Sequence, residues 1–178
     1  MQLGLGKNEV KIVPYNKEWK KGFLKIKEEI QLATGLDYEC IEHIGSTAIV
    51  NIAAKPVIDI LVGVSNLDKI KPDLFKEFEK IGFYRLRVGR EQEIVLAKFT
   101  DGTFKVKTHF IHLVKYKGDK WSQLVTFRDI LNKNKGLREE YELIKLNFTS
   151  KSNEGINEYT NLKEEFVLNV INKLDADE

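Results

Sequence analysis

An apolar run with a single carboxylate in its middle constrains the fold of this chain more than any other feature. Residues 56–64 read PVIDILVGV, a β-branched run that is too short for a typical helix and predicts a buried strand. An ionised carboxylate is costly among apolar side chains unless it is paired or bound to a metal. Asp59 therefore predicts a polar site on this strand or, alternatively, a structural carboxylate that accepts backbone N–H groups at a strand end.

The segment that precedes this strand has the composition of an anion-binding loop. Residues 43–55 read HIGSTAIVNIAAK, in which Gly45 allows close backbone approach and Ser46 and Thr47 supply hydroxyl groups. A helix that began here would also offer unpaired N–H groups to a phosphate oxygen. The same three residues could instead form only a tight turn and a helix N-cap, and the motif by itself leaves both interpretations open.

The chain as a whole is expected to form a single domain over residues 1–178, because no repeat or flexible linker divides it. Its 29 Lys+Arg and 27 Asp+Glu leave a net charge of only +2, so a dedicated duplex-DNA binder is not indicated and no specific nucleic acid is predicted as a partner. A lone cysteine, Cys40, excludes an internal disulfide framework. No run approaches the length of a membrane span, and we expect a cytoplasmic protein.

Hydrophobic periodicity predicts an α/β (α+β) fold, with a mixed β-sheet covered by helices and a helical C-terminal part. An Asp101-Gly102 pair predicts a two-residue type I′ hairpin that joins the last two strands. Strands are expected at residues 9–13, 38–44, 56–64, 83–88, 93–99 and 103–114. Helices are expected at residues 19–33, 67–81, 121–131, 137–148 and 159–174.

Histidines are rare in this chain, and each of the three is a candidate site residue. Alternation along residues 103–114 places His112 on an apolar stripe and His109 on the opposite side. His112 could be a ligand or a general base near Asp59, or a core histidine with satisfied hydrogen bonds. His43, just before the Gly-Ser turn, could contact a bound phosphate or orient the loop.

Four cationic side chains could receive an anionic substrate. Lys55 precedes the strand of Asp59, and Arg85 and Arg87 share one face of a later strand. Arg128 could reach the pocket, whereas Asp129 would brace the fold, because adjacent residues do not face each other on a helix. Solvated surface is the alternative for Lys55 and for the two strand arginines.

Six short segments, in a fixed order from about Val10 to the final helix, resemble the GrpB family. They read IVPYNKEW, IEHIGSTAI, KPVIDILV, HFIHLV, FRDIL and EYELIKLNF. The resemblance implies a nucleotidyltransferase-like fold, in which a Gly-Ser pair is followed, after a short helix, by a strand that bears acidic metal ligands. Gly45, Ser46 and Asp59 occupy these positions.

The chain departs from the pattern that this resemblance implies at the second acidic position. That position, two residues after Asp59, is Leu61, so two metal ions cannot be bridged in the usual way. We expect at most one Mg²⁺, bound by Asp59. Glu93, which shares a predicted strand face with Val95 and Ala97, is the reserve carboxylate for this ion.

The predicted function is to bind a nucleotide or another phosphorylated small molecule, with metal-dependent transfer of a nucleotidyl or phosphoryl group as the enzymatic form of that function. In this interpretation Asp59 and His112 are catalytic, and residues 45–47 bind phosphate. Two alternatives stay open: a non-catalytic nucleotide or metabolite sensor, and a partner-binding domain.

Overall fold

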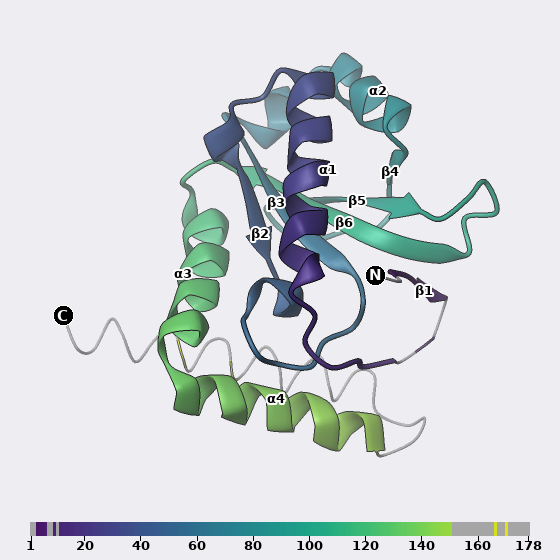
Figure 1. Cartoon of the computed structure of the whole chain (residues 1–178). Helices are drawn as coiled ribbons and strands as arrows, with labels where there is room; N and C mark the ends of the chain where they lie inside the picture. The colour runs from purple at the N-terminus through teal and green to yellow at the C-terminus, as the bar shows by residue number, and fades with distance from the viewer. Residues whose placement is uncertain (1–2, 7–8, 10, 151–165, 167–169, 171–178) are drawn as a thin grey trace.

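The computed structural model describes residues 3–6, 9, 11–150, 166 and 170 of the chain (Figure 1). Six strands form one mixed sheet, in the order β2–β3–β6–β5–β4, with the short β1 paired to β6. β3 and β6 are parallel, and the other pairs are antiparallel. The strands are β1 (Leu5–Gly6), β2 (Ile41–Ile44), β3 (Ile58–Val64), β4 (Phe83–Arg85), β5 (Ile94–Phe99) and β6 (Val106–Lys115).

Helices pack on both faces of the sheet and at one of its ends (Figure 1). α1 (Glu18–Thr34) and α2 (Pro72–Lys80) pack on one face, whereas α3 (Asp119–Lys133) packs on the other face, near β2. α4 (Lys135–Ser150) crosses below the sheet in the view of Figure 1. None of the helices in the described part of the chain is long and apolar enough to cross a membrane.

Alternation along β3 divides the apolar residues between two cores. Ile58, Ile60 and Val62 point toward α1 and α2, where they join the largest core. Leu61 points the other way and packs with Trp121 of α3 in a smaller cluster. Asp59 shares the face of Leu61, and this face is called the site face below.

The predicted mixed sheet with covering helices is confirmed, but the first two strands differ from the prediction. In the segment 9–13 only Val13 forms a bridge, with Ala54 in a loop, while residue 10 lies outside the described residues. The segment 38–44 begins with a 3₁₀ turn at Tyr38–Cys40, and its strand is only Ile41–Ile44. The composition of both segments is typical of strands, but only part of each segment lies beside another segment with which it can form strand hydrogen bonds.

The connection between β5 and β6 also differs from the prediction. The two strands are antiparallel, as expected, but a register shift at Lys98/Phe99 ends the regular pairing early. Residues 100–105 then form a longer loop, and its positive φ falls on Phe104 rather than on Gly102. The Asp101 carboxylate accepts hydrogen bonds from the N–H and hydroxyl of Thr103, which fixes this wider turn.

The predicted C-terminal helices are only partly covered by the structure. α4 confirms the helix expected at 137–148. The helix expected at 159–174 lies outside the described residues except for Phe166 and Val170, which are buried against Tyr141 and Leu131 in a third apolar cluster.

Candidate functional site

Asp59 lies near the start of β3, and His112 lies on the parallel neighbour β6. In the register of these strands His112 is opposite Leu61, so that it shares the site face with Asp59. The Nε2 atom of His112 is 3.4 Å from Oδ1 of Asp59, and the Asp59 side chain is 31% exposed. The predicted pairing of these two side chains across the sheet is therefore confirmed.

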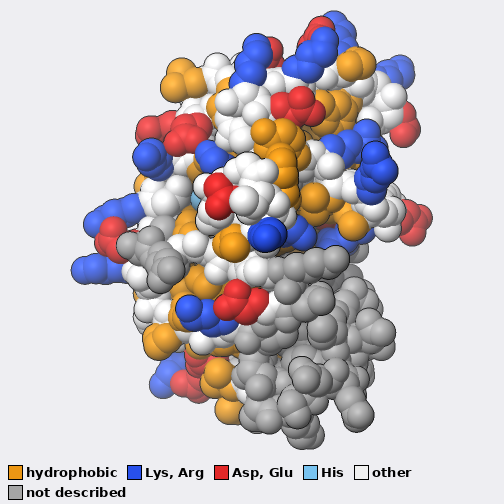
Figure 2. Space-filling model, turned by 90° about the vertical axis from the view of Figure 1, so that its right-hand side faces the viewer, with side chains coloured by type: hydrophobic (Ala, Val, Ile, Leu, Met, Phe, Trp, Pro, Cys, Tyr) orange, Lys and Arg blue, Asp and Glu red, His pale blue; other side chains and the backbone are white. Residues whose placement is uncertain are grey.

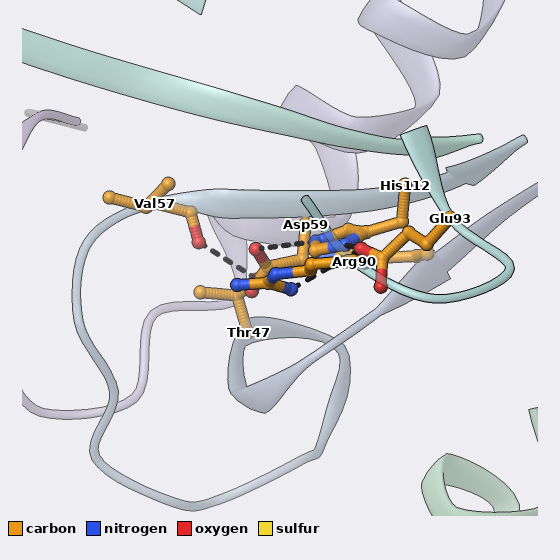
Figure 3. Close-up of polar contacts among 7 residues, drawn as sticks. Thr47, Val57, Asp59, Arg90, Glu93 and His112 are labelled. Atoms are coloured by element: carbon orange, nitrogen blue, oxygen red, sulfur yellow. Dashed lines mark hydrogen bonds and ion pairs between the residues drawn. The ribbon is translucent and has the colours of Figure 1, made fainter. Parts of the chain in front are cut away.

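The pair belongs to a row of four alternating charges (Figure 3). Nδ1 of His112 is 2.5 Å from Oε1 of Glu93, whose side chain is only 2% exposed. Arg90 donates to the same oxygen at 3.3 Å, and its own side chain is 55% exposed. The order Arg90, Glu93, His112, Asp59 leads from solvent through a buried carboxylate to the carboxylate of β3.

The two carboxylates determine the protonation state of His112. Burial by itself lowers the pKa of His112, but hydrogen bonds to Asp59 and Glu93, with their negative charges, raise it to about 9. Burial by itself raises the pKa of Glu93, but the contact with His112 and the charge of Arg90 bring that pKa below its usual value. Near neutral pH His112 is therefore an imidazolium that donates from both ring nitrogens. It must lose a proton before it can act as a metal ligand or general base.

The other two histidines lie on the opposite sheet face and are neutral. His43 stacks on Phe23, and its Nε2 is 3.0 Å from Oγ1 of Thr47. Burial lowers the pKa of His43 to about 4, and burial with the nearby Lys98 does the same to His109. The contact with Thr47 matches the alternative in which His43 orients the loop.

Gly45 lies directly against the carboxylate of Asp59. Its φ of 70° is in the region that favours glycine, and a Cβ atom there would lie within van der Waals overlap of Oδ2 of Asp59. The helix expected after this glycine is only a 3₁₀ turn, Ser46–Ala48, so a full helix N-terminus is not formed here. The loop thus brings backbone, rather than a helix end, next to Asp59.

The connector between β2 and β3 is fixed by polar side chains of α3 and α4. Asn132 accepts from the N–H of Val50 and donates to the carbonyl of Ala48. The Ser46 hydroxyl is 3.3 Å from that of Tyr141, so the predicted phosphate-binding hydroxyl already has a partner. The Thr47 hydroxyl likewise donates to the carbonyl of Val57. The contacts with Asn132 and Tyr141 hold the loop from outside, and the Thr47–Val57 contact closes it internally.

α4 adds a second pair of contacts to the same connector. The N–H of Ala53 donates to Glu142, and the Ala53 carbonyl accepts from the buried Lys145. Because the two side chains are three residues apart on one helix face, a single residue of the loop is bound from both sides.

Two of the predicted cationic residues, Arg85 and Arg87, lie away from Asp59. Arg85 lies on β4, at the far edge of the sheet, with its guanidinium 5.2 Å from the ring of Phe75 on the α2 side. Arg87 is exposed beyond the end of β4. Lys55 lies in the connector before β3, and its role in anion binding stays a prediction.

Arg128 has three partners within the protein, and its role in ligand binding stays a prediction. It donates to Glu42 at 2.5 Å and to the carbonyl of His43 at 2.9 Å, which ties α3 to β2. Its Nε also donates to Asp129 at 2.7 Å. The expectation that these adjacent residues serve different partners was wrong, because a long arginine side chain can curl back to the next carboxylate.

Arg90 is the site arginine that the sequence analysis missed. It lies in the turn before β5, where it forms a bridge with Glu93 three residues later. The signal for it was the Arg-x-x-Glu spacing in a polar turn, a weaker pattern than the alternating Arg85 and Arg87. The hydroxyl contact between Tyr141 and Ser46 was also not anticipated.

The described residues do not offer enough ligands for a metal ion bound by protein alone. No group of three His, Cys, Asp or Glu side chains that could bind one occurs in the part of the chain that the structure describes. Glu93 faces His112 and Arg90, and Leu61 is buried at the second acidic position. A Mg²⁺ ion held by Asp59 would need water and substrate phosphates as its other ligands, which is the usual arrangement for this ion.

The fold and site define an α/β protein in which a carboxylate–imidazolium pair lies beside a glycine loop on one face of a mixed sheet. In a comparison with known protein families, the family model described as "GrpB protein" matches residues 9–173 of this chain. The chain belongs to the GrpB family.

Individual relatives agree with this assignment. The chain is 40% identical to "Glutamate-rich protein GrpB" of Alkalihalophilus pseudofirmus, over 97% of this chain and 99% of that protein. The crystal structure of conserved protein GrpB from Enterococcus faecalis aligns with a TM-score of 0.76 and 25% identity, over 92% of this chain and 99% of that chain. A Cid1 poly(U) polymerase structure aligns at a TM-score of 0.49 and 15% identity, over 75% of this chain and 42% of that chain. A match at that level carries no information on function.

The pKa values of the three histidines predict two opposite dependences of the protein's stability on pH. His112, whose folded pKa of about 9 exceeds its unfolded value, stabilises fully below about pH 6.5, and this contribution is lost as the pH rises toward 9. Urea denaturation at several pH values gives the free energy of unfolding that His112→Gln loses relative to the wild type. We expect this loss to become smaller from pH 6.5 to pH 9, by at most about 1.4 kcal/mol per pH unit. His43 and His109, with folded pKa values of about 4, stabilise the fold above about pH 6.5, and this stabilisation is lost as the pH falls toward 4. They therefore do not change the stability between pH 6.5 and pH 9. A difference between wild type and variant that does not change with pH would contradict the charged state of His112.

Gly45→Ala should destabilise the protein and displace the Asp59 carboxylate. The positive φ and the overlap with Oδ2 act together, and we expect a loss of about 1–3 kcal/mol in urea denaturation. Gly102→Ala is the matched control, because Gly102 lacks a positive φ and a Cβ there meets no atom within 4 Å. Equal stability of the two variants would show that the contact between Gly45 and Asp59 does not constrain the loop.

Proposed function

We propose that the site face binds a nucleotide or another phosphorylated small molecule at the Gly45 turn and Asp59, where Asp59 would hold one Mg²⁺. The observation that carries this proposal is the partly exposed Asp59 carboxylate, which has an imidazolium on one oxygen and a glycine turn against the other. These contacts orient the carboxylate, and 31% of the Asp59 side chain is exposed. The GrpB resemblance, which implies a nucleotidyltransferase-like fold, supports the same ligand class.

Each member of the charge row has a distinct role in this proposal. His112 fixes the orientation of Asp59, and Glu93 fixes the orientation and charge of His112. Arg90, exposed at the outer end of the row, can exchange part of its contact with Glu93 for a phosphate oxygen. The bound Mg²⁺ would neutralise charge on the phosphate oxygens.

Group transfer is the enzymatic form of the proposal. The phosphorus of the transferred group would bond to an acceptor oxygen as its bond to the bridging phosphate oxygen breaks, with Asp59 positioning the phosphates. The remaining phosphate would leave with that electron pair, and the proton of the acceptor would pass to water. Because His112 carries a proton near neutral pH, it suits donation to a departing oxygen rather than removal of a proton from an acceptor.

A non-catalytic sensor is the second candidate function, and Leu61 is the observation that favours it. This buried apolar side chain occupies the second acidic position, so a two-metal clamp is not available. The sensor would bind the same ligand by the same residues without turnover. Release of product from a labelled nucleotide separates the two candidates.

Asp59→Asn should abolish Mg²⁺-dependent nucleotide binding, because it removes the charge while it preserves the size of the side chain. We expect the melting temperature of the wild type to rise with ATP and Mg²⁺ together but not with Mg²⁺ alone. Asp73→Asn, on the exposed surface of α2, is the control and should keep this rise. A full rise in Asp59→Asn, or a wild type that responds to no nucleotide, would refute the proposal; the second outcome would favour a partner-binding domain.

A further inference from the structure

Five strands place one residue each in a row that crosses the whole site face. Asp59 is opposite Phe110 on β6, Phe110 is opposite Ala97 on β5, and Ala97 is opposite Tyr84 on β4. On its other side Asp59 is opposite Ile44 of β2. Directly opposed residues share a sheet face, so the row leads from the proposed phosphate site to an aromatic edge.

The far end of this row is an exposed group of aromatic rings, called the aromatic platform here and made up of Tyr84, Phe99 and Phe104. The ring of Phe104 meets those of Tyr84 and Phe99 edge to face, with centroids 5.0 and 5.1 Å apart. Tyr84 is 39% exposed and Phe104 is 51% exposed. Figure 2, which faces the side of the molecule where the β5–β6 loop projects, shows hydrophobic side chains at the surface with Lys and Arg beside them.

Phe110 lies between the aromatic platform and Asp59. The ammonium of Lys107 is 5.7 Å from the centroid of the Phe110 ring, so a positive charge lies next to this ring. With neighbouring strands about 4.8 Å apart, Phe110 is about 5 Å and Tyr84 about 14 Å from Asp59 along the row. An extended nucleoside triphosphate covers a span of this order.

We propose that the aromatic platform binds the planar heteroaromatic ring of the phosphorylated ligand, and so selects nucleotides over ring-free phosphates. This inference rests on the proposed function, because it takes the phosphates to lie at Asp59. Aromatic side chains stack on nucleobases of every kind, with about 1–3 kcal/mol per base. The aromatic platform therefore provides selection for a ring without selection for one particular base.

The size of the aromatic platform favours a ring over a protein surface. A fully buried aromatic side chain contributes about 150–250 Å² of buried surface area, and a stable protein interface buries about 800 Å² on each partner. Two rings that are about half exposed supply only a fraction of that area, but enough to cover one planar ring. Its continuity with Asp59 through Phe110 gives the ring a phosphate site within reach.

The test compares a ligand that has a ring with one that lacks it. Dissociation constants of MgATP and of magnesium tripolyphosphate are measured by calorimetry for the wild type, Tyr84→Ala and Phe104→Ala. We expect MgATP to bind about tenfold more weakly to each variant, with tripolyphosphate unchanged. Phe104→Tyr should restore MgATP binding, and Tyr38→Ala, at an exposed aromatic residue outside the aromatic platform, should leave both ligands unaffected.

The outcomes separate this inference from the proposed function. If tripolyphosphate binds and MgATP binds no more tightly, or if the platform variants keep the wild-type preference for MgATP, the phosphate site stands and the ring site is refuted. If neither ligand binds the wild type, the proposed function fails and the inference fails with it. Variants that lose stability but keep the preference for MgATP would show that the rings only brace the β5–β6 loop.

Discussion

The contact between the His112 imidazolium and two carboxylates is the interaction on which the site depends. Glu93 is almost fully buried, and an unpaired carboxylate in that position would be strongly unfavourable. His112 and Arg90 compensate its charge, and the second ring nitrogen of His112 orients Asp59. The parallel pairing of β3 with β6 brings Asp59 and His112 onto one face, and the antiparallel pairing of β5 with β6 adds Glu93.

The same strand that carries Asp59 also anchors the main core, so the base of the site consists of buried, packed residues. Alternate residues of β3 pack under α1 and α2, and the intervening ones face the site. The loop before β3 is held by Asn132 of α3 and Glu142 of α4. A ligand bound at Asp59 would therefore meet a surface whose backbone and charges are already arranged, which reduces the entropic cost of binding.

Features of this site that depend on local periodicity could be predicted from the sequence, and features that depend on register or burial could not. Alternation placed His112 on the apolar stripe of its strand and Asp59 on the face of Leu61, because each lies in a regular strand. That the two faces coincide follows from the register of β3 and β6. The protonation of His112 depends on the buried Glu93, whose position follows from the β5–β6 register. Arg90 was missed because it lies in a turn, where no periodicity indicates direction.

The charged state of His112 is the central claim, and an NMR titration of the three histidine rings tests it most directly. The ring assigned to His112, by its absence in His112→Gln, should titrate with a pKa of about 9, while those of His43 and His109 should titrate near 4. A His112 ring that titrates at or below about 6.5, the ordinary value for histidine, would show that the two carboxylates do not clamp it and would contradict the account.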